Sequence, residues 1–425
     1  MEINLQELIE AKILTPETAG QVNSFYENRK GKQGNKLVIV FGILGALMVG
    51  SGIILIIANN WDDLGKVGQL SVGLLPLLLA QLLAVYAFLK KRDSKVWIEV
   101  SSLLVFFAIA TGISVVGQVY NLHSNFGRFL LTWIILSLPL LYTHRSALVS
   151  LLVWGLATWY VAEVSYNFSH NEFAPWYWAV VAALFPYYIN LILKSPTSNF
   201  TFFHHWVVAG SLAFSLGMFA HKADELIMLA YITLFSIYVL IGQLKPFQNI
   251  RTIANAYLVA GSAGIMSLLL FLSFDGYWEN AYDHIEDWIS SREMIANAVL
   301  VVVALVLLYK LHSYKKFTLI NAKSFAFIGF IILFFMGFIS PTMAQLLTNF
   351  LILALGVFTI RDGATNQRLG IMNYGLLIVS ALIMCRFFDK DLSFIWRGLL
   401  FVAVGVGFFV ANYWMSKKKK QTPGL

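Results

Sequence analysis

The stretch from Leu37 to Ala58 constrains this chain most, because its 22 residues carry no charge. A basic cluster precedes it, and Asn59, Asn60 and Trp61 follow it. About 20 apolar residues, each adding ~1.5 Å of helix, cross the hydrocarbon core of a bilayer. We therefore predict a membrane-spanning helix that is retained in the protein, with its basic side in the cytoplasm and its Asn-Trp end outside.

The composition predicts that most of the remaining chain also lies in the membrane. Of the 425 residues, 59% are hydrophobic and 12% are charged, whereas soluble domains have about 25% charged residues. So little polar surface excludes an ordinary soluble globule and predicts an all-α, polytopic membrane bundle whose partner is the lipid bilayer. The net charge of +8 lies in short loops between apolar segments, which indicates membrane topology rather than a nucleic-acid-binding surface.

Apolar segments recur along the chain and predict about fourteen spans within residues 37–414. With the N-terminus in the cytoplasm, 23 of the 30 Lys and Arg residues fall on the cytoplasmic side and 7 outside, as the positive-inside rule requires. Segments 129–142 and 146–165 are separated by three residues only, so a re-entrant hairpin is an alternative there. The segments are 37–58, 68–89, 98–117, 129–142, 146–165, 175–193, 203–220, 225–243, 253–273, 294–311, 317–339, 342–360, 369–385 and 395–414.

Both ends of the chain are polar and are predicted to be cytoplasmic. Residues 1–36 predict a small helical hairpin, in which Thr15 caps the second helix and Pro16 is its first residue. Two helices this short bury little by themselves, so we expect the hairpin to dock on a protein partner. Residues 415–425 form a basic tail.

Polar residues gather at the outer ends of at least five predicted spans. If these spans are neighbours, the polar groups form an outer-face pocket in which Arg386 or Arg397 binds a carboxylate or phosphate. In the alternative, Asp389 and Asp391 neutralise the two arginines and the remaining groups cap helix ends. The candidate binding residues are Asn59, Asp62, Gln118, Tyr120, Gln345, Asn349, Arg386, Asp389, Asp391 and Arg397.

Two further polar features receive structural interpretations. His204 and His205 begin the predicted span 203–220, where we expect them to extend toward the cytoplasmic interface. The acidic, aromatic loop 274–293 predicts an interfacial helix, because Trp and Tyr favour that depth. Neither feature matches a metal-binding pattern, and the sequence contains no phosphate loop, zinc motif or nucleophile elbow. We therefore expect no metal and no cofactor, and we assign no catalytic residue.

Several of these motifs together resemble a known family. They are the turn Ile13-Leu14-Thr15-Pro16-Glu17, the first span ending Ala58-Asn59-Asn60-Trp61-Asp62, the run Gly117-Gln118-Val119-Tyr120-Asn121-Leu122, and the ending Arg386-Phe387-Phe388-Asp389 through Arg397-Gly398. The chain is similar in these positions to the prokaryotic membrane proteins grouped as domain of unknown function 2157. The resemblance implies the cytoplasmic (inner) membrane of a prokaryote and no assigned activity.

Three classes of function fit these features. The first is transport or binding of a small molecule or lipid at the polar outer face. The second is an enzyme that acts on a lipid-linked or envelope substrate at the outer leaflet, with Asp62, Asp389 or Asp391 and Arg397 as its minimal groups. The third is a membrane scaffold or accessory subunit. We place transport or binding first, because no catalytic motif supports the enzyme.

Overall fold

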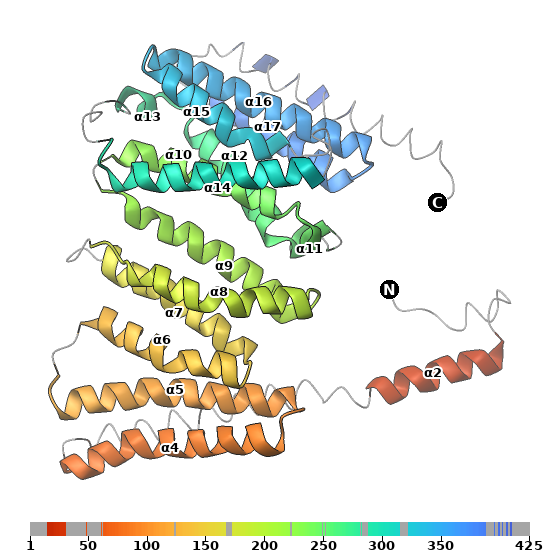
Figure 1. Ribbon diagram of the computed structural model, residues 1–425. Helices are drawn as coiled ribbons and strands as arrows, with labels where there is room; N and C mark the ends of the chain where they lie inside the picture. The colour runs from red at the N-terminus through yellow and green to blue at the C-terminus, as the bar shows by residue number, and fades with distance from the viewer. Residues whose placement is uncertain are drawn as a thin grey trace. The chain divides into compact units, whose positions relative to one another are not determined.

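The computed structural model describes most of the chain as helices connected by short loops (Figure 1). It describes residues 15–30, 48, 61, 63–122, 125–166, 172–221, 223–248, 250, 252–280, 282, 288–314 and 322–387, and also 395, 398, 399, 402, 405, 406 and 409. The chain divides into two compact units, Met1–Gly73 and Leu74–Leu425. The boundary falls within one helix, α4.

The first unit contains helix α2, Pro16–Lys30. Its start agrees with the predicted cap, since the hydroxyl of Thr15 accepts a hydrogen bond from the amide of Thr18 at 3.3 Å. The other helix of the predicted hairpin, and the predicted first span 37–58 apart from Met48, lie outside the described residues.

Twelve of the fourteen predicted segments contain a helix in the described part of the chain. Segments 129–142 and 146–165 are two separate helices of 18 and 19 residues, α6 and α7. The segment 395–414 lies almost entirely outside the described residues. The longer helices are α4 (Lys66–Lys90), α5 (Lys95–Val119), α6 (Phe126–Thr143), α7 (Ala147–Ser165), α8 (Trp176–Lys194), α9 (Asn199–Leu216), α10 (Asp224–Ile241), α12 (Ala256–Phe271), α14 (Arg292–Tyr314), α15 (Ala326–Gly337), α16 (Pro341–Thr365) and α17 (Leu369–Phe387).

Short helical turns connect some of these helices. They are α11 (Lys245–Gln248), α13 (Asp275–Asn280) and the 3-10 turns η1 (Gly217–Phe219), η2 (Thr252–Ala254) and η5 (Ala322–Phe325). Among the described residues, nine helices are long and apolar enough to cross a membrane: α4 to α9, α14, α16 and α17. Helices α10, α12 and α15 are apolar but shorter. The chain is therefore a membrane protein with several apolar helices.

Helix α10 lies between two hydrophobic cores of the second unit. Tyr238 and Leu234 on one face pack into a core built mainly from α4 to α9. Ile232 and Val239 on the other face pack into a core built from α12 to α17. A helix that is apolar on all sides is expected to be buried, and α10 occupies this position between the two groups (Figure 1).

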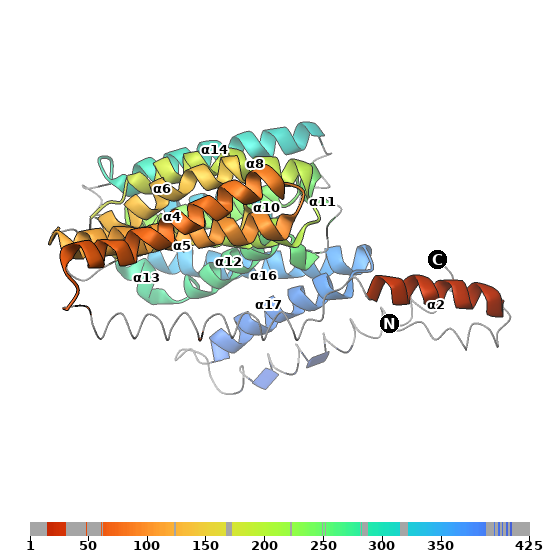
Figure 2. The same ribbon diagram turned by 90° about the horizontal axis from the view of Figure 1, so that it is seen from below.

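Helices α16 and α17 pack very closely, and two glycines permit this approach. A Cβ atom built on Gly363 would lie 2.3 Å from the backbone nitrogen of Met372, and one on Gly375 would lie 2.7 Å from that of Ile360. Small residues allow helix backbones to come together in membranes. The view in Figure 2 shows this helix pair on one side of α10 and α14 on the opposite side.

Candidate functional site

Three of the predicted site residues meet at Ser273, just after the C-terminal end of α12. The side-chain amides of Gln345 and Asn349, both on α16, donate hydrogen bonds to the carbonyl oxygen of Ser273 at 3.3 and 3.2 Å. A guanidinium nitrogen of Arg386, near the end of α17, donates to the Ser273 hydroxyl oxygen at 3.2 Å. The structure thus brings residues of the consecutive helices α16 and α17 to the end of α12, 72 to 113 residues earlier in the chain.

At Ser273, side chains of neighbouring helices supply hydrogen-bond donors to the C-terminal end of α12. The last carbonyl groups of a helix have no partner within the helix and carry partial negative charge. Gln345 and Asn349 supply donors there, and the guanidinium of Arg386 also lies 4.7 Å from the ring centre of Phe274. The side-chain oxygen of Asn349 is buried and accepts no hydrogen bond from a described residue. One acceptor therefore remains open at this cluster.

The other predicted site residues are not part of the Ser273 cluster as described. Gln118 and Tyr120 lie at the end of α5 with exposed side chains, which form no hydrogen bond with any described residue. The predicted residues Asn59, Asp62, Asp389, Asp391 and Arg397 lie outside the described part of the chain.

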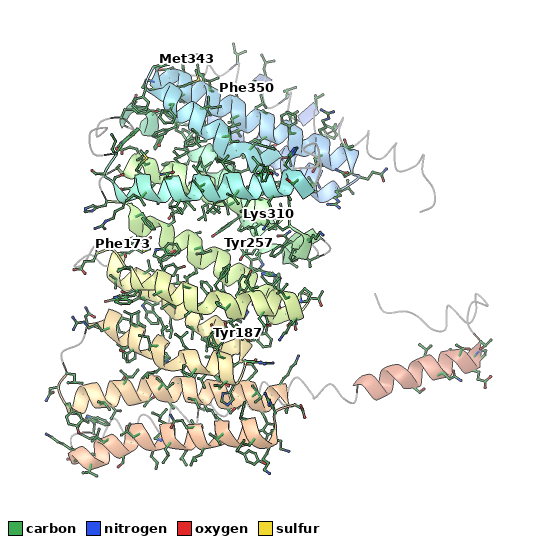
Figure 3. All side chains as sticks on the ribbon, viewed as in Figure 1. Phe173, Tyr187, Tyr257, Lys310, Met343 and Phe350 are labelled. Carbon is green, nitrogen blue, oxygen red and sulfur yellow. The ribbon has the colours of Figure 1, made fainter. Side chains whose placement is uncertain are left out.

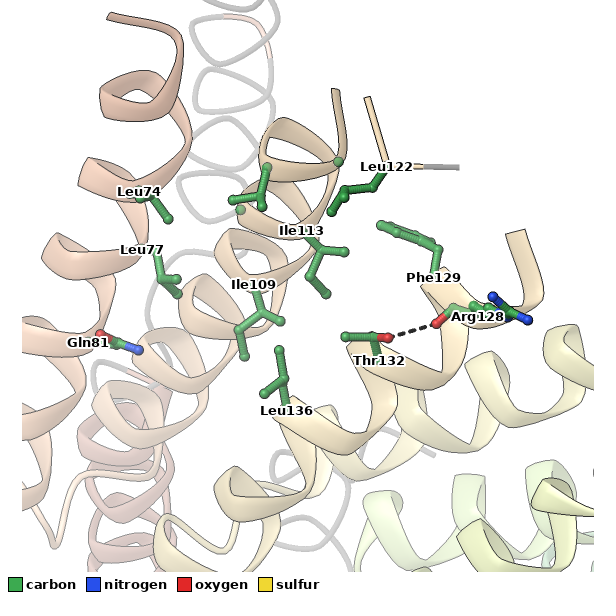
Figure 4. Close-up of a pocket in the computed structure, with 13 residues that line it drawn as sticks. Leu74, Leu77, Gln81, Ile109, Ile113, Leu122, Arg128, Phe129, Thr132 and Leu136 are labelled. Carbon is green, nitrogen blue, oxygen red and sulfur yellow. Dashed lines mark hydrogen bonds between the residues drawn. The ribbon is translucent and has the colours of Figure 1, made fainter. Parts of the chain in front are cut away.

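A cavity of about 540 Å³ opens between α4, α5 and α6, within the second unit (Figure 4). The local sequence pattern did not predict it, because a gap between three apolar helices leaves no mark on their periodicity. Thirteen residues form its lining: Leu74, Leu77, Gln81, Ile109, Gly112, Ile113, Val116, Gly117, Leu122, Arg128, Phe129, Thr132 and Leu136.

Most of this lining is aliphatic, with a few polar groups at separate depths. The end of the cavity near Gly117 and Leu122 also holds Arg128, whose guanidinium points away from the aliphatic side chains in Figure 4. The hydroxyl of Thr132 donates to the carbonyl oxygen of Arg128 at 2.8 Å. Gln81 lies farther along the cavity wall on α4, where its side-chain amide has no hydrogen-bond partner among the described residues.

The cavity and its Gly117–Leu122 motif lie within the part of the chain that matches a protein family. Residues 6–150 match the family of predicted membrane proteins DUF2157. The resemblance noted in the sequence is thereby confirmed over α2 and α4 to α6, whereas the C-terminal motif lies outside the matched residues. No curated protein and no solved structure matches the chain. The family description supports a membrane protein and carries no activity.

The prediction that His204 and His205 extend toward the cytoplasmic interface is wrong; both lie outside the family-matched residues. Both side chains are buried rather than extended toward an interface. The Nδ1 atom of His205 lies 2.6 Å from the Tyr188 hydroxyl, and His204 Nε2 lies 3.0 Å from the hydroxyl of Ser150. The Tyr188 hydroxyl is also 2.8 Å from that of Tyr257. Polar partners on α7, α8 and α12 make burial favourable, and a single-helix pattern does not reveal them.

The loop 274–293 also differs from its prediction as an interfacial helix. It contains the short helix α13, and its indole rings are buried: Trp278 is 1% and Trp288 is 5% exposed. Trp278 donates to the carbonyl oxygen of Leu272 at 2.7 Å, and Tyr277 donates to that of Glu225 at 2.8 Å. Burial raises the pKa of Tyr277 well above its ordinary value. These aromatic side chains pack in the hydrophobic core of α12 to α17 instead of contacting lipid headgroups.

Within the described part of the chain, no group of three or more His, Cys, Asp or Glu residues could bind a metal ion. The α4–α6 cavity is aliphatic with separate polar groups, and the Ser273 cluster presents mainly donors.

Proposed function

We propose that this protein binds an amphipathic small molecule in the α4–α6 cavity. The observation that carries the proposal is the cavity itself: about 540 Å³, mostly aliphatic, with Gln81 on its wall and Arg128 at the Gly117 end. Ligand sites are typically cavities of ~300–1,000 Å³ with apolar walls and a few placed polar groups. The cavity fits that description.

The lining indicates the chemistry of the ligand. Leu74, Leu77, Ile109 and Leu136 would pack against an aliphatic body, and Gln81 offers a hydrogen-bond donor and acceptor to a polar substituent. Arg128 is exposed and forms no ion pair with a described residue, so its side chain is available to an acidic group at the Gly117 end. A fatty-acid-like or lipid-linked molecule has these properties.

The depth of the cavity favours binding over a complete transport path. Its lining runs from Gly117 to Ile109 on α5 and from Arg128 to Leu136 on α6. Eight residues of helix correspond to about 12 Å, compared with about 30 Å for the hydrocarbon core. The cavity thus enters from one end and ends near the middle of these helices.

The proposed membrane arrangement places this cavity in the outer half of the bilayer. In that arrangement fourteen spans cross the inner membrane of a prokaryote, with both termini in the cytoplasm. Arg92 and Arg145 lie in the loops after α4 and α6, and Lys194 is the last residue of α8. These basic residues support a cytoplasmic placement of the corresponding helix ends. The N-terminal hairpin would then be available to a cytoplasmic partner.

A photoreactive fatty acid carrying a diazirine tests the proposal directly. It would be added to the full-length protein in nanodiscs, and the labelled peptides would be identified by mass spectrometry. We expect labelling of α5 and α6 that Leu136→Trp abolishes by filling the cavity, and that Arg128→Gln weakens about tenfold through loss of a charge-assisted bond.

The matched control for the filled cavity is Phe350→Trp, at a 67% exposed position of α16 that is labelled in Figure 3. It should leave the labelling of α5 and α6 unchanged. Equal labelling of all lipid-facing helices, unaffected by Leu136→Trp, would overturn the proposal.

A further inference from the structure

A second cavity, of about 510 Å³, lies at the other end of α4, α5 and α6. Residues of the loops after α4, α6 and α8 line it together with Tyr187 of α8. Its lining is far more polar than that of the α4–α6 cavity. The residues that carry the argument are Arg92, Lys95, Glu99, Arg145, Tyr187 and Lys194.

Four cations border this cavity without acidic partners. Arg92, Lys95, Arg145 and Lys194 all have exposed side chains, and none forms an ion pair with a residue that the structure describes. Arg92 and Arg145 lie in the loops after α4 and α6, and the two lysines are helix ends, Lys95 the first residue of α5 and Lys194 the last of α8. The fold, and not one local run of sequence, therefore gathers them. Like charges in one place repel each other, and a bound anion would relieve that repulsion.

One of the two acidic residues in the lining, Glu99, is already engaged. The carboxylate of Glu99 accepts hydrogen bonds from the backbone amides of Ala147 and Leu148, at 2.9 and 3.1 Å, and from the Ser146 hydroxyl. It therefore compensates the positive N-terminus of α7 rather than the neighbouring cations. Asp93 is the other acidic residue in the lining, so positive charge remains in excess.

The backbone around the cavity is fixed by contacts of its own. Tyr187 donates its hydroxyl hydrogen to the carbonyl oxygen of Arg145 at 3.1 Å. Arg145 has a φ of +55°, a left-handed conformation, and the Ser198 hydroxyl caps the start of α9. The loops after α6 and α8 are thus held in place before any ligand binds, which lowers the entropic cost of binding.

We propose that this second cavity binds a phosphate-bearing anion. Arginine side chains from two loops and lysine side chains from two helix ends supply charge and donors for the phosphate oxygens. Asn190 supplies a neutral amide in the same lining. Basic pockets between membrane helices suit anionic lipid headgroups, and a soluble phosphate compound presents the same chemistry. This site is separate from the α4–α6 cavity and does not depend on the function proposed for it.

Native mass spectrometry of the delipidated full-length protein tests this site. The probes are phosphatidylglycerol, phosphatidylcholine and inorganic pyrophosphate, each added alone. The double variant Arg92→Gln/Lys194→Gln removes two cavity cations. Its control, Lys310→Gln/Arg361→Gln, removes the same charge from exposed residues outside the cavity lining.

We expect an adduct with phosphatidylglycerol or with pyrophosphate that falls at least about tenfold in the cavity variant and persists in the control. A phosphatidylglycerol adduct alone identifies a lipid headgroup as the source, and an equally dependent pyrophosphate adduct identifies a soluble phosphate. Equal losses in both double variants, equal binding of phosphatidylcholine, or no adduct at all would overturn the proposal.

A third variant keeps the test decisive if the double variant does not fold. Arg145→Asn removes one cavity cation at a left-handed position that Asn tolerates well. It should weaken the same adduct while leaving fatty-acid labelling of the α4–α6 cavity intact. Unchanged adduct levels in a folded Arg145→Asn protein would contradict the site.

Discussion

The side-chain amide of Asn349 donates a hydrogen bond to the carbonyl oxygen of Ser273, 76 residues earlier in the chain. The bond connects α16 to the end of α12, and Gln345 and Arg386 approach the same serine. A cluster predicted from the sequence as a ligand site is thus, in the structure, a set of donors on a helix end. Both roles remain compatible, because the side-chain oxygen of Asn349 has no described hydrogen-bond donor.

Replacing Arg386 with Met distinguishes the structural role from the binding role. We expect Arg386→Met to lower the unfolding free energy by about 1–2 kcal/mol, because it loses the bond to the Ser273 hydroxyl and the contact with Phe274. Thermal unfolding in detergent measures this change. The control is Arg128→Met, the same substitution at an exposed arginine with no described ion pair. Equal melting temperatures for the two variants would contradict the structural role.

A second prediction concerns Glu99, whose carboxylate binds the first amides of α7. We expect Glu99→Gln to destabilise the protein by about 1–2 kcal/mol, because the neutral amide loses the interaction with the helix N-terminus and turns an NH₂ group toward donors. Unfolding of Glu172→Gln is the comparison, since the Glu172 carboxylate is exposed and forms no described hydrogen bond. A Glu99→Gln protein as stable as this comparison would refute the assignment.

Glu293 repeats this arrangement at α10. It lies in the first turn of α14, and its carboxylate accepts from the backbone amides of His221 and Ala223, the latter at 3.2 Å. In both places, a glutamate near the start of one helix accepts hydrogen bonds from backbone amides at, or just before, the start of another helix. In the sequence, Glu99 and Glu293 are each visible only as an acidic residue near the start of an apolar segment. That position is the one signal that could have indicated their contacts with a neighbouring helix.

How much the sequence predicted depends on whether a property is local. Apolar length is local, so segments such as 146–165 closely match helices such as α7 (Ala147–Ser165). The cap at Thr15 is also local and is confirmed. The partners of His205 are on α8 and α12, and the polar contacts of Ser273 come from α16 and α17. Such contacts depend on which helices are neighbours, and periodicity does not encode that choice.

A third prediction tests the close packing of α16 and α17. We expect Gly375→Ala to destabilise the protein by about 1–3 kcal/mol, because the new methyl group would lie 2.7 Å from the Ile360 backbone nitrogen. Gly370→Ala, on the same helix α17, meets no atom within 4 Å and should be neutral or slightly stabilising. Chemical denaturation of the two variants side by side measures the difference. Indistinguishable midpoints would show that the helices separate easily.

The last prediction concerns Lys323, which is 5% exposed in the η5 turn before α15. Its ammonium lies 4.8 Å from the ring centre of Tyr374. The negative charge of Asp362 also acts on this ammonium. A buried charge is stabilised by such partners and disfavoured by its removal from water.

Replacing Lys323 with Met removes the charge and keeps a side chain of similar length. We expect Lys323→Met to be as stable as the wild type or about 1–3 kcal/mol more stable, because the folded protein no longer has to bury a charge. Thermal unfolding in detergent measures the difference, with Lys310→Met at an exposed position of α14 as the control. A Lys323→Met protein that is clearly less stable than this control would contradict the prediction. In that case Tyr374 and Asp362 would stabilise the ammonium more strongly than burial disfavours it.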